Sequence, residues 1–134
     1  MKANELRVGD YVYLITNRDT GEKRLVKVTG LLKTYVSVYS EESKSEYTTT
    51  YEYIEPIPID DDFIAKNFRG DNTDIYFRIY YYRYLEGKSK CFIEYRGYDG
   101  SRTQPFTNVC VYIGFIHQLQ QVFSFLGIDK QLTI

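Results

Sequence analysis

One segment near the C-terminal end of the chain has the pattern of an amphipathic helix, and it constrains the fold more than any other stretch. Between Gly114 and Gly127, apolar side chains recur at the i, i+1, i+4, i+7, i+8 and i+11 spacing of a single helical face. They are Phe115, Ile116, Leu119, Val122, Phe123 and Leu126. The pattern predicts a helix that ends where Gly127 adopts a left-handed conformation. Because no other segment is comparably amphipathic, we expect the strands of the chain to pack against this helix.

The other side of this predicted helix is polar, with His117, Gln118, Gln120, Gln121 and Ser124. His117 is the only histidine of the chain. Nucleophilic catalysis would require a serine or cysteine and an orienting acid near it, and the spacing of the sequence indicates neither. We therefore interpret His117 as a solvated or hydrogen-bonding group on the outer side of a helix that closes the core.

The first part of the chain consists of short segments in which apolar and polar residues alternate. In the first of them, Val12 and Leu14 share one face, as residues of a half-buried strand do. Strands are expected over residues 11–15, 24–29, 34–39 and 46–54. The segment Arg7–Val12 resembles the first strand of SH3-like modules of the KOW and Tudor kind. Residues 1–55 are therefore predicted to form a small β-subdomain, either a strongly bent sheet or an SH3-like barrel.

Pro56 and Pro58 break the strand pattern and mark the start of a second subdomain, residues 56–134. The three carboxylates at 60–62 point about 100° apart on a helix, so they do not converge on a metal ion. We interpret Asp60 as the N-cap of a short helix instead. This subdomain is expected to contain, in order, a short helix over 60–68 that ends near Gly70, strands at 74–85, 90–96 and 108–113, and the terminal helix. The prediction is an α+β chain with an antiparallel three-strand sheet, folded as one compact unit.

Composition narrows the class of protein. Fifteen tyrosines, eight phenylalanines and no tryptophan favour a β-rich fold, because tyrosine suits half-buried strands. A net charge of −1 gives no bulk attraction to nucleic acid or to anionic membranes. No apolar run has membrane-spanning length and no signal core precedes the polar start, so the protein is expected to be cytoplasmic.

The two cysteines, Cys91 and Cys110, are expected to be reduced and buried on strands. A disulfide between neighbouring strands is the alternative if the protein is exported. Two cysteines and one histidine do not suffice for a structural zinc site without carboxylates. We predict no metal and no cofactor.

The sharpest functional lead is a row of tyrosines with one arginine on a single face of the strand expected at 74–85. The row comprises Tyr76, Arg78, Tyr80, Tyr82 and Tyr84. The rest of the chain could cover this face. Alternatively, it could form a protein interface, where tyrosine and arginine are favoured, or stack the bases of a single strand of nucleic acid.

The sequence contains no P-loop, dinucleotide fingerprint, nucleophile elbow or metalloprotease motif. We therefore predict no catalytic residues and a non-enzymatic role in protein interaction or assembly. The alternative is a nucleic-acid-binding module that uses the N-terminal barrel and the tyrosine and arginine face.

Three separated stretches together resemble a family of small uncharacterised proteins from gut Bacteroidetes and their prophages. They are the segment NELRVGDYV at 4–12, EPIPI at 55–59 followed by an acidic helix start, and IHQLQQVF at 116–123 followed by 127–132. The chain departs from the family at 128–130, where that family has a Thr-Gly-Glu-Glu-like turn. The resemblance implies a cytoplasmic protein carried by bacteria or mobile elements, and it transfers no catalytic residue or ligand.

Overall fold

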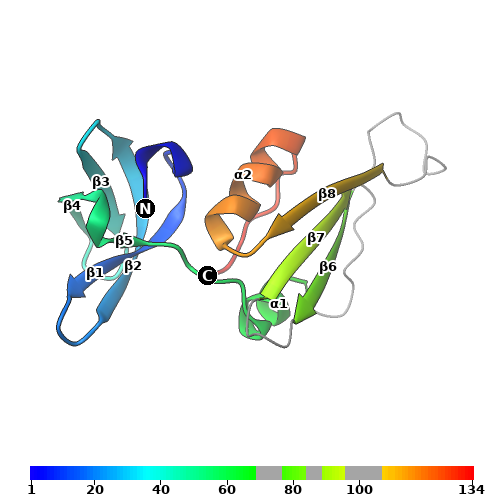
Figure 1. Cartoon of the computed structure of the whole chain (residues 1–134), viewed down its shortest axis with the longest axis horizontal. Coiled ribbons are helices and arrows are strands. Elements are labelled where there is room, and N and C mark those ends of the chain that lie inside the picture. Colours follow the sequence, from blue (N-terminus) through cyan, green and yellow to red (C-terminus); the bar gives the residue numbers. More distant parts are fainter. Residues whose placement is uncertain (69–76, 84–88, 96–106) are drawn as a thin grey trace. The chain divides into compact units, whose positions relative to one another are not determined.

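A computed structural model describes the backbone of residues 1–68, 77–83, 89–95 and 107–134, and the side chains of residues 1–68 and 113–134. The chain has an α+β architecture, as predicted (Figure 1). It divides into two compact units. The first contains Met1–Ile57 and Phe115–Val122, and the second contains Pro58–Gly114 and Phe123–Ile134.

The first unit is built on a five-stranded antiparallel sheet, coloured blue to green in Figure 1. Its strands are β1 (Tyr11–Asn17), β2 (Glu22–Leu31), β3 (Tyr35–Ser40), β4 (Ser45–Thr50) and β5 (Ile54–Glu55). They lie in the order β4-β3-β2-β1-β5, so β4 and β5 form the two edges and the sheet is open. Of the two predicted arrangements, an open sheet is therefore present, and a closed barrel is not confirmed.

One face of this sheet carries the apolar core of the first unit. Val12 lies opposite Val26, and Val28 lies opposite Val38, so valines from adjacent strands pack side by side. The buried cluster consists of Leu6, Val12, Leu14, Val26, Val28, Val36, Val38 and Ile54. The predicted common face of Val12 and Leu14 is confirmed, since both side chains are buried while their neighbours along β1 are partly exposed.

The single strand predicted at 46–54 is wrong, because the chain crosses from one edge of the sheet to the other there. β4 pairs with β3, whereas β5 pairs with β1 through Ile54 and Glu55. A one-turn 3-10 helix, η2 (Tyr51–Tyr53), joins the two strands. A second 3-10 helix, η1 (Ala3–Glu5), precedes β1. Alternation alone does not reveal such a crossing, because both strands keep the same two-residue period.

The second unit contains a short helix and a three-stranded sheet. Its elements are α1 (Asp61–Phe68), β6 (Phe77–Arg83), β7 (Ser89–Tyr95) and β8 (Thr107–Ile113), with the strands antiparallel in the order β6-β7-β8. Asp60 is the N-cap of α1, as predicted, because its Oδ1 accepts a hydrogen bond from the Phe63 N–H at 2.8 Å. The amide of Asn67 bonds both backbone groups of Thr133, at 2.7 and 2.8 Å, and holds the C-terminal tail against α1.

The terminal helix α2 spans Ile116–Leu126 and ends as predicted. Gly127 has φ +69°, its N–H donates to the Ser124 carbonyl, and the Ile128 N–H donates to the Phe123 carbonyl. These two bonds form a Schellman motif, which requires a residue in the left-handed region at the position of Gly127.

Candidate functional site

The polar side of α2 contacts the segment that leads into β1, within the first unit. Gln120 Nε2 donates to the Gly9 carbonyl at 3.1 Å, and its Oε1 accepts from the Tyr11 N–H at 2.8 Å. β5 covers β1 only at Tyr13 and Leu14. One side-chain amide thus bonds the backbone at the start of β1 as an adjacent strand would, and it protects part of an otherwise open edge.

Gln121, the next residue of α2, donates to a carboxylate in the segment that leads into β1. Gln121 Nε2 donates to Asp10 Oδ2 at 2.7 Å and to the Glu5 carbonyl at 3.0 Å. Asp10 Oδ2 also accepts from the Arg7 N–H at 2.8 Å. Asp10 is buried, and its burial raises the pKa of the carboxyl group, although the bonds from Gln121 and Arg7 oppose this shift. Two of the stretches on which the family resemblance rests are therefore in direct contact.

His117 is buried, so the interpretation of it as a solvated group on the outer side of the helix is wrong. Only 3% of its surface is exposed, because the turn before β1 packs on the polar side of α2. Its ring stacks with that of Phe115 at a centroid distance of 5.9 Å and an interplanar angle of 20°. The Nδ1 atom has no hydrogen-bond partner among the described residues. Desolvation lowers the pKa of the imidazole, while the charges of Asp10 and Glu5 act in the opposite direction.

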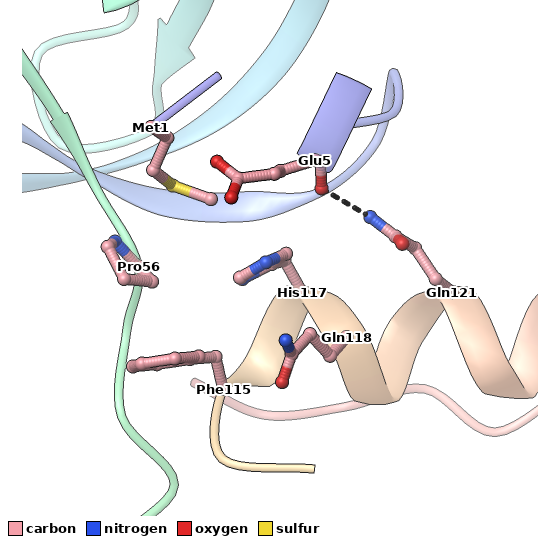
Figure 2. Close-up of a pocket in the computed structure, with 7 residues that line it drawn as sticks. All are labelled: Met1, Glu5, Pro56, Phe115, His117, Gln118 and Gln121. Carbon is pink, nitrogen blue, oxygen red and sulfur yellow. Dashed lines mark hydrogen bonds between the residues drawn. The ribbon is translucent and has the colours of Figure 1, made fainter. Parts of the chain in front are cut away.

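Beside His117 lies an open recess of about 250 Å³ (Figure 2). It is lined by Met1, Glu5, Pro56, Phe115, His117, Gln118 and Gln121, all in the first unit. Its walls contain no hydroxyl, thiol or lysine nucleophile that the imidazole could activate. In the part of the chain with described side chains, no three His, Cys, Asp or Glu residues gather as metal ligands would. The recess therefore has the groups to bind a ligand by contact, charge and hydrogen bonds.

A second candidate site is the face of the first sheet opposite to the core, which we call the outer face. It carries Tyr11, Tyr13, Ile15, Lys23, Leu25, Lys27, Tyr35 and Tyr39. Lys27 lies over the Tyr11 ring at 5.7 Å from its centroid, and Lys23 lies over the Tyr13 ring at 5.9 Å. Lys23 also forms an ion pair with Glu55. Leu25 is 36% exposed and Tyr35 is 51% exposed, so apolar surface is available at this face.

Sequence reasoning missed both the recess and the outer face as sites. Alternation in β1 places Tyr11 and Tyr13 on one face, but only the strand register shows that Leu25 and two lysines lie beside them. The recess forms from residues more than fifty positions apart in the chain, and no local pattern indicates such a contact.

The tyrosine and arginine row predicted on the longest strand falls where side chains are not described. The backbone of β6 places Arg78, Tyr80 and Tyr82 opposite Glu94, Phe92 and Lys90, respectively. Tyr76 and Tyr84 lie outside the described residues. Whether this face is covered or available therefore stays a prediction.

The backbone register does bear on the cysteines. Cys91 in β7 lies opposite Ile113 of β8, and not opposite Cys110. The two cysteines are therefore not a directly cross-strand pair.

Comparison with family models, curated proteins and solved structures finds no match to this chain. Among the described residues, no helix has the length and apolar character needed to cross a membrane.

The buried imidazole makes the stability of the first unit depend on pH. Because burial in the folded chain lowers the pKa of His117 below its ordinary value of 6.5, the unfolded chain binds the proton more readily. Above pH 6.5 the neutral imidazole does not reduce the free energy of unfolding. As the pH falls below 6.5, the free energy of unfolding decreases by up to ~1.4 kcal/mol per pH unit. Urea unfolding between about pH 8 and about pH 5.5 should show this loss, and His117→Gln should flatten the curve. Equal slopes for both proteins would contradict it.

Proposed function

We propose that this chain is a non-enzymatic protein-interaction or assembly protein of bacterial or mobile-element origin, and that the outer face of its first sheet binds the partner. One observation carries the proposal. The outer face exposes Leu25 and Tyr35, and its two lysines already contact tyrosine rings, with Lys23 also paired with Glu55. Tyrosine is enriched among the residues that dominate protein interfaces, and its ring and hydroxyl suit a surface that is only partly dry.

The charges on this face favour a protein partner over a polyanion. Lys23 is paired with Glu55, and both lysines lie over tyrosine rings. Leu25 lies opposite Tyr13, between Lys23 and Lys27 on the same face of β2. Because the ion pair and the tyrosine rings already engage these lysines, the face offers a polyanion little free positive charge, while its exposed apolar surface suits a protein.

The proposal includes an SH3-like arrangement for the first unit. Its support is the chain path, in which five consecutive strands place β4 and β5 at opposite edges and η2 forms the link between them. A register shift between Val28 and Gly30 in β2 adds a bend of the kind that such small barrels use. Small barrels of this class host many unrelated functions, so the arrangement is compatible with the proposal and does not decide it.

The row from Tyr76 to Tyr84 stays in the proposal as a second interaction surface, centred on Tyr80, Tyr82 and Tyr84. Its support is the sequence pattern and the backbone register of β6. If these tyrosines were buried inside one molecule, this second surface would have no support.

Charge insertion at the outer face tests the proposed function. Leu25→Glu replaces an exposed apolar side chain of the face by a carboxylate, and Val8→Glu makes the same change at an apolar residue that is 65% exposed outside the face. If the partner is a second copy of the chain, we expect Leu25→Glu to abolish the concentration-dependent self-association seen in sedimentation velocity. If the partner is another protein, we expect it to abolish cross-linking from a photoreactive residue at position 39. Val8→Glu should leave both unchanged. A chain that stays monomeric and cross-links no better from position 39 than from position 8 would contradict the proposal.

The alternative function is binding of single-stranded nucleic acid, and one observation favours it. Lysines alternate with tyrosines on the outer face, which is the composition of surfaces that stack bases and contact phosphates. A salt titration with single-stranded DNA and RNA separates this alternative from the main proposal. Binding that weakens linearly with the logarithm of salt concentration, and is lost in the Arg78→Ala, Tyr80→Ala double variant, would support the alternative. Absence of salt-sensitive binding would remove it.

A further inference from the structure

We propose that the recess beside His117 receives the guanidinium group of an arginine side chain presented by the protein partner. This inference rests on the proposed interaction function and names the chemistry of one anchor within it. It concerns a different surface from the outer face, so the two can fail separately.

The walls of the recess suit a flat group with an apolar stem. Figure 2 shows Pro56, Phe115 and Met1 around one side, with His117 in the middle and the Glu5 side chain above it. The Phe115 and His117 rings lie within 20° of parallel, so together they offer aligned aromatic surface. A guanidinium is planar and stacks on aromatic faces, whereas the compact ammonium of lysine does not.

One carboxylate at the recess can pair with a cation, although the N-terminal ammonium of Met1, which bonds the carbonyls of Tyr51 and Ile54, belongs to the same lining. Glu5 is the only acidic residue among the lining residues, and Gln121 bonds both its carbonyl and the buried Asp10. Burial lowers the pKa of the His117 imidazole overall, while the charges of Asp10 and Glu5 act in the opposite direction and favour a positive charge. One Glu5 oxygen accepts from the Lys2 N–H at 2.6 Å, which fixes the carboxylate at the edge of the recess. A fixed carboxylate is a favourable partner for a guanidinium.

Hydrogen bonding supports the same occupant. Nδ1 of His117 has no partner among the described residues, but it has almost no accessible surface, so an occupant of the recess does not reach it directly. The Glu5 carboxylate is an acceptor at the recess, and a guanidinium with five N–H donors in a fixed plane can bind it while that plane lies against the rings.

The size of the recess suits one side chain. Pockets for small-molecule ligands generally measure about 300–1,000 Å³. The recess has about 250 Å³ and is open on one side. Arginine is also one of the residues on which protein interfaces depend most strongly.

A peptide titration followed by NMR tests the inference on the full chain. The probe is a short glycine- and serine-rich peptide with one central arginine, and the signals observed are the His117 imidazole and the backbone amides of Phe115 and Gln118. The matched probes carry citrulline, which has the same shape without the charge, or lysine. We expect saturable shifts with the arginine peptide and at least about tenfold weaker binding of both other peptides.

The matched variants are Glu5→Gln and Glu41→Gln. Glu5→Gln removes the charge and keeps an oxygen that can accept from the Lys2 N–H, while Glu41 is exposed on the β3–β4 turn, outside the recess. We expect Glu5→Gln to weaken the arginine peptide at least about tenfold and Glu41→Gln to leave it unchanged. Equal binding of the citrulline peptide, an unaffected Glu5→Gln variant or the absence of saturable shifts would overturn the inference. If free arginine bound more tightly than the peptide, the guanidinium that the recess receives would not come from a protein partner.

The outcome for the recess is independent of the outcome for the outer face. If the arginine peptide fails while Leu25→Glu still abolishes association, only the arginine anchor is wrong. If association itself is absent, the proposed function falls whatever the recess binds.

Discussion

Replacing Leu119 by alanine should lower the free energy of unfolding by ~2–5 kcal/mol. Leu119 lies in the part of α2 that belongs to the first unit, and its side chain has 0% exposed surface. Truncation removes three buried carbon atoms, and the surrounding side chains cannot fully close the cavity that remains. Urea unfolding monitored by tyrosine fluorescence measures the loss as a lower transition midpoint.

The matched control for Leu119 lies in the same helix. Phe125 is larger and equally apolar, but it is 84% exposed. Phe125→Ala should therefore change stability by no more than ~0.5 kcal/mol, since a substitution at the surface leaves no cavity. Comparable losses for the two variants would mean that the helix does not bury the face on which Leu119 lies.

The second large effect is expected at Gln121. Gln121→Ala removes the donor to Asp10 Oδ2 at 2.7 Å and the donor to the Glu5 carbonyl at 3.0 Å. The buried carboxylate keeps its bond from the Arg7 N–H but loses its side-chain partner. We expect a loss of ~1–3 kcal/mol, because a buried acceptor without its donor keeps its full desolvation cost. Urea unfolding at neutral pH provides the measurement.

A double-mutant cycle shows whether the loss at Gln121 arises from the carboxylate. In Asp10→Asn the charge is gone, so removal of the Gln121 amide should cost measurably less than in the unmodified chain. The difference is the coupling between the two side chains. If the two substitutions are simply additive, the contact at 2.7 Å does not carry the effect and the account of this site is wrong.

Local patterns predicted the elements of this chain well, for physical reasons that particular residues illustrate. The end of α2 follows from the freedom of Gly127 to adopt a positive φ, and the start of α1 follows from the side chain of Asp60. The buried face of β1 follows from the alternation around Val12 and Leu14. Each of these features depends on residues close together in sequence.

Features that depend on distant contacts could not be predicted in this way. The helical pattern places His117 and Gln120 on the polar side of α2, and solvent is the ordinary environment of such a side. That side is instead covered by a turn 109 residues away, whose backbone groups replace water as partners of Gln120. The recess and the outer face depend on the same kind of information, because pairing register and long-range packing assemble them.

The most direct test of the account is amide hydrogen exchange at Tyr11. Its N–H donates to Gln120 Oε1, whereas the Val28 N–H donates to the Asp10 carbonyl nearby. We predict that the Tyr11 amide is protected in the unmodified chain and loses protection in Gln120→Ala, while the Val28 amide stays protected in both. An unprotected Tyr11 amide, or one whose protection survives Gln120→Ala, would contradict the conclusion that α2 holds the start of β1.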